Sequence, residues 1–398
     1  MSHALSHSWA QLTYKSAVVV IRRGAGLSQA ALPLSFFSGG GVAGQRIAVR
    51  MLASSTPLTT LIGTADRHHR LDLLTISTLR ARDPVFDSAR LASILCAAVM
   101  LLSACSTIEP SLSLPRVIAH RGGTADAPEN TLEAIRVAIG NHADAIWLSV
   151  QLSKDGVPVL FRPADLAVLT DASGPVSART AAELSRVNAG WTFKSASAQT
   201  GDAFPYRSTP VGIPTLRDAL RQIPANVPVI LDMKALPAEP QTTAVAGVLT
   251  DENAWSRVTV YSTEAAYQKS FSAYPQARVF EGRDATRTRL VRVLLGEGCR
   301  DVPLARTSTA FELHRDLTVS EKFTLGEGHS AVRATMWTSE TVACFRQNRD
   351  VRIVAIGVNS IEDYRDAVCL HLDAVLSDSP KKMTVIRAGM LGGVRCGQ

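Results

Sequence analysis

From residue 116 to about residue 385, short apolar runs alternate with stretches whose apolar residues recur every three or four positions. The short runs predict buried strands, and the periodic stretches predict amphipathic helices. The strand candidates are RVIAH, AIWLSVQL, VPVLF, VPVILDMKA, RVTVYS, QARVFEG, STAFELH, RATMWTS, VRIVAIGV and DAVLSDSP, and the clearest helix candidates are NTLEAIRVAIGNH, TLRDALRQI and IEDYRDAV. Repeated β-α units predict a parallel sheet, and this length suits a (β/α)8 TIM barrel. An open doubly wound sheet is the alternative, but no G-x-G-x-x-G follows the first strand.

In such a barrel the chemistry lies at the C-terminal ends of the strands, so the residues there are the first candidates for a functional site. They are His120, Arg121, Trp147, Ser149, Arg162, Asp232, Lys234, Ser262, Glu281, Glu312, His314, Trp337 and Asp378. Side chains alternate along a strand, so Trp147 and Ser149 share one face. Glu312 and His314 also share a face, and a structural salt-bridged pair is their simplest interpretation.

The segment before the barrel predicts a targeting sequence. Residues 90–105, RLASILCAAVMLLSAC, form an apolar run that follows several arginines and is too short to span a bilayer. Its end, Leu-Ser-Ala-Cys, resembles the lipobox of bacterial lipoproteins, in which the cysteine carries lipid; that cysteine is Cys105. A buried apolar helix that ends in cysteine is the alternative.

The predicted domain organisation follows from this segment. Residues 1–84 are predicted to be non-structural or to lie upstream of the true start, and residues 85–105 to form a lipoprotein-type signal peptide. Residues 106–115 form a tether, residues 116–385 a single globular barrel and residues 386–398 a tail. We therefore expect a protein of the bacterial cell envelope, either lipid-anchored or periplasmic.

Charge and cysteine usage agree with this picture. The formal net charge is +7, but residues 1–90 hold 10 of the 42 basic and only 4 of the 35 acidic residues, so the barrel is close to neutral. No basic stripe with interleaved aromatic residues is present, which argues against nucleic acid as a partner. Cys299, Cys344, Cys369 and Cys396 have no C-x-x-C spacing, so a zinc site is not expected. One or two disulfides can form if the chain is exported, although the sequence alone does not pair the cysteines.

One long stretch of the sequence is similar to a known protein family. VIAHRGGTADAPENTLEAI, residues 117–135, resembles the first strand, loop and helix of the glycerophosphodiester phosphodiesterases, which are TIM barrels. The similarity continues through VQLSKDGVPVLF, LTDASGPV, AAELSRVNAG, GIPTLRDAL, VPVILDMKA, MWT and DAVLSDSP, and covers residues 116 to about 382. The resemblance implies hydrolysis of glycerol-linked phosphodiesters to glycerol phosphate and an alcohol. It also implies a catalytic His120, a phosphate-binding Arg121 and a bound Mg²⁺ or Ca²⁺.

The chain departs from the family at the metal site. Glu129, Asp232 and Lys234 match the family pattern. The two metal-binding carboxylates, however, fall at Trp147 and Ser149, and the family's second histidine falls at Arg162. A hard cation needs charged oxygen ligands, so we expect no metal cofactor. Glu129 is interpreted mainly as a residue that holds its loop, with Asn130 or Thr131 capping the next helix, and Asp378 is interpreted as structural.

Three interpretations remain open. In the first, Arg121, Arg162 and Lys234 surround the phosphate and replace the metal charge, His120 acts with Asp232, Glu312 or His314 as acid and base, and Trp337 forms a wall for the leaving group. In the second, the pocket binds phosphodiester or phospholipid headgroups without cleaving them. In the third, a lipid anchor holds the barrel on a membrane and the pocket has no role. An unpaired arginine at a barrel mouth calls for an anion, which favours the first two.

Overall fold

The computed structural model describes residues 10–14, 17–21, 113–195 and 203–396. The predicted signal peptide, Cys105 and most of the predicted tether lie outside these residues. Strands β1 (Ala10–Tyr14) and β2 (Ala17–Ile21) pair with each other, and β1 also pairs with β9 (His314–Phe323). Among the described residues, no helix has the length and apolar character needed to cross a membrane.

The remaining strands build the predicted barrel. In spatial order the parallel strands are β7 (Val258–Tyr261), β6 (Val229–Met233), β4 (Ala145–Leu152), β3 (Arg116–His120), β12 (Ala374–Ser377), β11 (Arg352–Ile356) and β8 (Ser308–Glu312). The short β5 (Pro158–Leu160) pairs antiparallel with β4. The stretch around Val279 closes the circle: Phe280 N donates to Val260 O, and Glu281 N donates to Ser308 O. The parallel (β/α)8 architecture predicted from the sequence is therefore confirmed.

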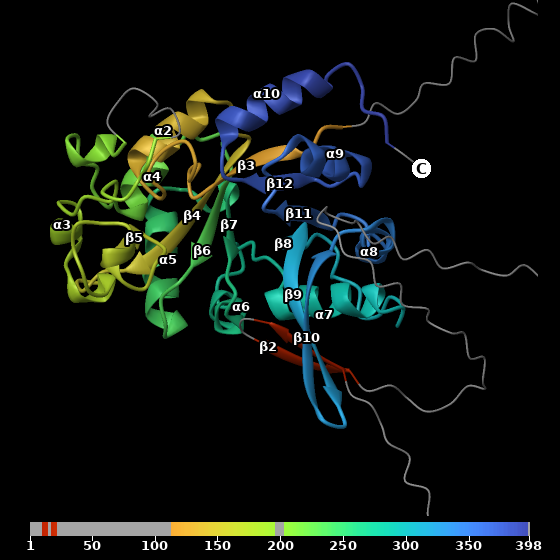
Figure 1. The fold of residues 1–398 in the computed structure, drawn as a ribbon. Coiled ribbons are helices and arrows are strands. Elements are labelled where there is room, and N and C mark those ends of the chain that lie inside the picture. Colours follow the sequence, from red (N-terminus) through yellow and green to blue (C-terminus); the bar gives the residue numbers. More distant parts are fainter. Residues whose placement is uncertain (1–9, 15–16, 22–112, 196–202, 397–398) are drawn as a thin grey trace, which may run out of the picture. The chain divides into compact units, whose positions relative to one another are not determined.

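Helices follow the strands along the chain and lie on the outside (Figure 1). The helices are α2 (Leu132–Gly140), α3 (Ala181–Leu184), α4 (Leu216–Gln222), α5 (Ala238–Asp251), α6 (Ala265–Phe271), α7 (Arg283–Leu294), α8 (Ser339–Phe345), α9 (Ile361–Cys369) and α10 (Pro380–Met390). Short 3₁₀ turns are η1 (Leu166–Val168), η2 (Val176–Ala178), η3 (Pro205–Arg207) and η4 (Trp255–Arg257). As predicted, α2 begins at a threonine cap, since the Thr131 side chain accepts a hydrogen bond from Ala134 N.

The barrel interior is filled in layers. Its central apolar cluster contains Ile118, Trp147, Ile230, Ala310 and Leu376, together with Ala145, Tyr261, Phe280, Val354 and Ala374. Because side chains alternate along each strand, the residue two positions after a central one also faces inward at the C-terminal mouth. Those mouth residues are His120, Ser149, Asp232, Glu312 and Asp378. The alternation thus gathers polar groups from five strands into one place.

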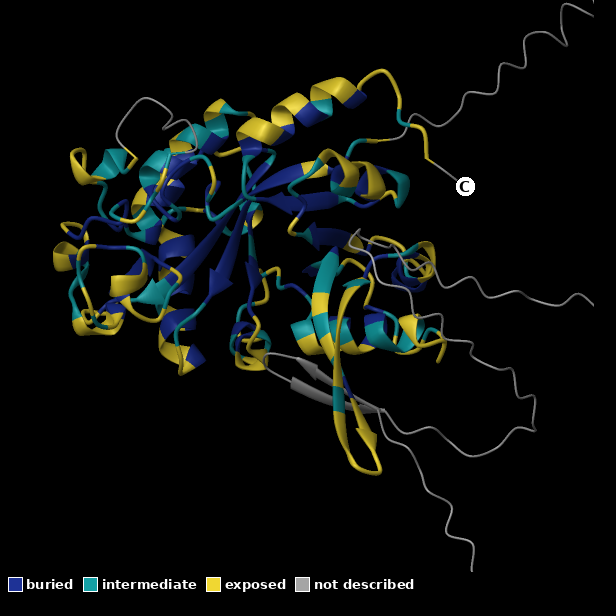
Figure 2. Ribbon diagram, in the orientation of Figure 1, coloured by how far each residue is buried: buried dark blue, intermediate teal, exposed yellow. Residues whose placement is uncertain are grey.

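A long hairpin is inserted after β8. It consists of β9 and β10 (Gly326–Thr335), which are largely exposed, whereas the barrel strands are buried (Figure 2). Two predicted strands therefore have other boundaries: His314 in STAFELH begins β9, and RATMWTS contains the end of β10 and the start of the connection to α8. This changes the positions of His314 and Trp337.

Two disulfides join the elements of the C-terminal half. Cys299 pairs with Cys344, which lies on α8, and Cys369 at the end of α9 pairs with Cys396. The second disulfide fastens the chain after α10 to the barrel, so the last described residues are held in place. The cysteines that the sequence left unassigned are thus paired.

We expect reduction of these disulfides to lower stability. They close loops of 45 and 27 residues, and for such loops the chain-entropy model gives about 3–4 kcal/mol each. Replacing Cys299 and Cys344 by serine should therefore lower the free energy of unfolding by about 2–4 kcal/mol. Urea unfolding with and without reductant measures this, and an equal stability of the oxidised, reduced and serine forms would contradict it.

Candidate active site

His120 and Asp378 form a hydrogen-bonded pair at the C-terminal mouth of the barrel. His120 ends β3 and Asp378 follows β12, and these two strands are neighbours. His120 Nδ1 lies 2.7 Å from Asp378 Oδ1, and the imidazole is 25% exposed. Its Nε2 has no hydrogen-bond partner within the described part of the chain. The ring is therefore held through one nitrogen and can offer the other to a substrate.

Asp378 is itself held by two further donors. Thr124 Oγ1 donates to Oδ1 at 2.9 Å, and Asn359 Nδ2 donates to Oδ2 at 2.8 Å. The hydrogen bond with His120 is the main cause that lowers the pKa of Asp378 to about 2. Asp378 is thus ionised at neutral pH and favours the His120 tautomer with its proton on Nδ1. Sequence reasoning interpreted Asp378 as structural only; its inward position at the end of the last strand was the signal for this second role.

We expect Asp378→Asn to destabilise the fold at neutral pH but not in strong acid. The folded-state pKa of about 2 lies below the ordinary value of 3.8. The ionised carboxylate therefore stabilises the fold above about pH 4, and this contribution is lost as the pH falls toward 2. Urea unfolding at several pH values should show the two proteins converging in acid. Asp366→Asn, at an exposed position of α9, is the control; a difference that persists unchanged at pH 2 would contradict this assignment.

Arg121 projects from a tight turn directly after His120. Its backbone has a φ of 52°, and Gly122 follows with a φ of 85°. A Cβ on Gly122 would approach the Ala134 side chain to 2.8 Å, so only glycine fits between this turn and α2. Arg121 Nη1 lies 2.6 Å from Glu129 Oε2. Glu129 therefore holds both its loop and the Arg121 guanidinium.

Ser149 and Asp232 stand side by side on β4 and β6. They are register partners, and Lys234, two residues beyond Asp232, places Nζ 2.9 Å from Asp232 Oδ2. Ser149 Oγ, Asp232 Oδ1 and Glu129 Oε1 are buried and have no hydrogen-bond partner among the residues that the structure describes. Buried polar atoms without partners are rare in native proteins. These three therefore mark the floor of the mouth as a place that a polar ligand or water satisfies.

Trp147 fills the interior directly beneath this floor. It is 2% exposed, and its ring centroid lies 4.7 Å from that of Tyr261 and 5.9 Å from that of Phe280. The indole thus belongs to an aromatic cluster of the barrel core. Ser149 alone of the two β4 residues presents a polar atom near the mouth.

Arg162 lies beside the same strand end and is exposed. Its neighbour Phe161 donates N–H to Ser149 O, and Gln151 Nε2 donates to both Phe161 O and Pro163 O. These bonds fix the backbone on either side of Arg162. Within the described residues its guanidinium has no ion-pair partner, so its charge is available to an anion.

In the structure Glu312, His314 and Trp337 are bound by groups other than His120. Glu312 binds Arg283 Nη2 through both carboxylate oxygens, at 2.6 and 2.7 Å, and also accepts from Arg315. His314 bonds Thr335 and Asp363, so it does not pair with Glu312, and the predicted salt bridge between them is wrong. Glu312 is thus held by two arginines, and the role of either group as an acid or base stays a prediction. Trp337 is fully buried, donates to Phe311 O and packs on Phe345, so it forms no wall of the mouth.

Comparison with known proteins identifies the family to which the chain belongs. The family model "Glycerophosphoryl diester phosphodiesterase family" matches residues 120–382. The chain belongs to this family. The matched range begins at His120 and includes the whole barrel after it, as the His-Arg-Gly and Pro-Glu-Asn-Thr segments predicted.

Relatives in this family include both close and distant proteins. The uncharacterized protein Rv2277c of Mycobacterium tuberculosis is 45% identical over 266 residues, covering 67% of this chain and 87% of that protein. The crystal structure of its glycerophosphoryl diester phosphodiesterase domain matches with a TM-score of 0.64 and 43% identity, covering 69% of this chain and 100% of that one. A phosphodiesterase of Oleispira antarctica, solved with the product sn-glycerol-3-phosphate, has a TM-score of 0.50 and 21% identity over 69% of this chain and 97% of its own, which shows a common fold.

The side chains at the mouth do not fit the metal site that the family resemblance implies. Trp147 and Ser149 supply no carboxylate, and Glu129 and Asp232 each already bind one cation, Arg121 and Lys234. Across the described ranges, no group of three or more His, Cys, Asp or Glu residues could hold a metal ion. A divalent cation at this place would meet two carboxylates whose charge is already neutralised by Arg121 and Lys234, and not the free carboxylates that such a cation needs.

Proposed function

We propose that this chain hydrolyses glycerol-linked phosphodiesters to glycerol phosphate and an alcohol, with fixed cations in place of a metal ion. The observation that carries the proposal is the hydrogen bond that joins His120 to an ionised Asp378 at the barrel mouth, where the strands that carry Arg121 and Lys234 also end. Family membership supports the phosphodiesterase reaction class. The product sn-glycerol-3-phosphate bound to the Oleispira antarctica relative supports the substrate class.

The arrangement supplies both proton transfers of an in-line displacement. Asp232 Oδ1, the carboxylate oxygen without a partner, takes the proton of the adjacent glycerol hydroxyl as that oxygen attacks phosphorus. Protonated His120 gives its Nε2 proton to the departing alcohol, while Asp378 stabilises the imidazolium before transfer. Water then opens the cyclic phosphate: His120 takes its proton, Asp232 returns one to the glycerol oxygen, and both groups are restored. The cations stabilise the charge that develops on the phosphoryl oxygens.

The decisive experiment is hydrolysis of glycerophosphocholine and glycerophosphoethanolamine with excess EDTA and with added Ca²⁺ or Mg²⁺. EDTA-resistant turnover supports the proposal. Turnover that requires either cation overturns the metal-free form while leaving the reaction class intact.

Arg162 should bind the phosphate directly. Arg162→Gln removes a charge-assisted contact, so we expect phosphate and glycerol phosphate to bind about 1–3 kcal/mol more weakly. Arg365→Gln, at another exposed arginine on α9, is the matched control and should leave affinity unchanged. Isothermal titration measures both, and equal affinities of wild type and Arg162→Gln would remove Arg162 from the site.

A second candidate function is binding of phosphodiester headgroups without cleavage. It is favoured by the absence of carboxylates at Trp147 and Ser149 and of a histidine at Arg162, while His120 and the cations are retained. Absence of turnover in every condition, together with tight headgroup binding that Arg162→Gln weakens, would establish this function instead.

Export to the bacterial cell envelope, with lipid on Cys105, is the proposed location. Two disulfides support an oxidising compartment. Mass spectrometry of the mature protein tests the proposal: a lipidated N-terminal Cys105 supports it, and peptides from residues 1–84 in the mature chain overturn it.

A further inference from the structure

The opposite, N-terminal end of the barrel contains a hollow that the proposed reaction does not use. Its volume is ≈ 340 Å³, within the range of small-molecule sites. Side chains alternate along each barrel strand, so the residue two positions before each residue of the central apolar cluster also faces inward, at the N-terminal end of the barrel. Three of these are arginines, Arg116 before Ile118, Arg278 before Phe280 and Arg352 before Val354. An adjoining hollow of ≈ 760 Å³ shares Arg278 and Arg352 and adds Arg306 and Arg346.

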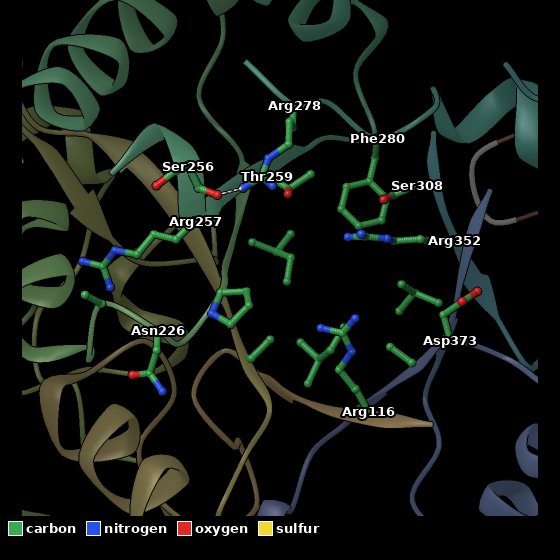
Figure 3. A pocket seen from close by; sticks show the side chains of 17 residues that line it. Arg116, Asn226, Ser256, Arg257, Thr259, Arg278, Phe280, Ser308, Arg352 and Asp373 are labelled. Carbon is green, nitrogen blue, oxygen red and sulfur yellow. Dashed lines mark hydrogen bonds between the residues drawn. The ribbon is translucent and has the colours of Figure 1, made fainter. Parts of the chain in front are cut away.

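The charges around this hollow are not balanced. Asp373 is the one carboxylate lining the first hollow among the described residues, and its Oδ2 already accepts from Arg346 Nη2 at 3.0 Å and Ile353 N at 2.8 Å. Within the described part of the chain, the guanidinium groups of Arg116 and Arg352 have no hydrogen-bond or ion-pair partner, and Figure 3 shows both extending into the hollow. Burial and the positive charge of Arg352 together lower the pKa of Arg278. Like charges so placed repel one another, and an anion would relieve that repulsion.

Not every arginine at this end faces the hollow. Arg257 donates to Leu220 O and Ile223 O at the end of α4, and Figure 3 shows its guanidinium directed away. Arg278 donates to Ser256 O and Val258 O, so it is positioned by the backbone at the start of β7. The cationic rim facing the hollow thus consists of Arg116, Arg352 and the fixed Arg278.

The floor of the hollow is apolar. It is lined by Ile118, Ile230, Phe280 and Val354, which retain 4–6% exposure. The occupant therefore combines an anionic group with a small apolar part. We propose that this end of the barrel binds a phosphate ester, with the phosphate between Arg116, Arg278 and Arg352 and the ester carbon chain on the apolar floor. The same chemistry belongs to a free alkyl phosphate and to a phosphate-monoester lipid headgroup.

The test is calorimetric titration of the full chain with inorganic phosphate and with butyl phosphate. We expect butyl phosphate to bind at least about tenfold more tightly than phosphate, because its chain reaches the apolar floor. Arg352→Gln and Arg116→Gln should each weaken this binding at least about fivefold, the scale of a charge-assisted bond. Arg162→Gln should weaken only the separate phosphate site at the catalytic mouth, and Arg365→Gln should change neither.

The variants also separate this proposal from the proposed function. Arg352→Gln should hydrolyse glycerophosphodiesters as the wild type does, because Arg352 lies at the opposite end of the barrel from His120. Retention on phosphatidic acid vesicles that Arg352→Gln abolishes would identify the lipid headgroup as the source, and butyl phosphate binding without such retention would identify a free ester. If neither probe distinguishes Arg116→Gln and Arg352→Gln from the wild type, the proposal is overturned, whatever the hydrolysis assay shows.

Discussion

Replacing His120 by alanine is expected to lower the kcat of glycerophosphodiester hydrolysis by about 10²–10⁴-fold, the usual contribution of a positioned acid or base. KM should change little, because Arg121, Arg162 and Lys234 remain to bind the phosphate. The loss should appear in kcat because His120 Nε2 acts on the departing oxygen, which carries charge only in the transition state.

His314→Ala is the matched control for this measurement. Its ring nitrogens contact Thr335 and Asp363, and the residue begins β9 rather than facing His120. Steady-state kinetics should therefore show the His314 variant within about twofold of wild type, as for a substitution away from the site. If both variants lost a comparable part of kcat, the effect of the His120 substitution would reflect a loss of stability and not the loss of a catalytic group.

The barrel itself was predictable because its signal is local. A buried strand followed by an amphipathic helix can be read within about 30 residues, and repetition of that unit leaves few topologies. The same alternation predicted that Trp147 and Ser149 share a face, and both are buried on that side of β4. The run QARVFEG was also predicted as a strand, and in the structure the stretch around Val279 closes the barrel through a few backbone hydrogen bonds.

The contacts that the sequence did not reveal join residues that are distant along the chain. His120 and Asp378 are 258 residues apart, and only the adjacency of the first and last strands joins them. Glu312 and His314 share a face only if their strand is continuous. In the structure β8 ends at Glu312, and the inserted hairpin turns His314 toward Asp363. A spacing of two residues cannot reveal such a break.

The loss of the family's carboxylates also has a packing consequence that the sequence alone did not show. A free carboxylate at position 147 would need a cation, whereas Trp147 fills its place with aromatic contacts to Tyr261 and Phe280. The barrel core therefore gains apolar contact where the resemblance places a metal ligand. Ser149 is buried and keeps a hydroxyl without a hydrogen-bond partner among the described residues.

We expect the double variant Trp147→Glu, Ser149→Asp to create a calcium-dependent protein. Without metal it should be about 3–5 kcal/mol less stable than the wild type, because the indole packing is lost. The two new carboxylates would also lie beside Asp232 without cations of their own, which adds to this cost. Ca²⁺ binds the folded state only, so a concentration of about 100 times its Kd should restore about 2.7 kcal/mol.

Thermal unfolding with EDTA and with Ca²⁺ measures this rescue. The Trp147→Gln, Ser149→Asn variant has side chains of the same size without the charged ligands and should stay destabilised in both conditions. The wild type should unfold at the same temperature with and without Ca²⁺, since Glu129 and Asp232 are already neutralised by Arg121 and Lys234. A cation binds tightly only where negative charge is not already compensated. Stabilisation of the wild type by micromolar Ca²⁺ would therefore show that Glu129 and Asp232 can bind the ion despite their ion pairs with Arg121 and Lys234.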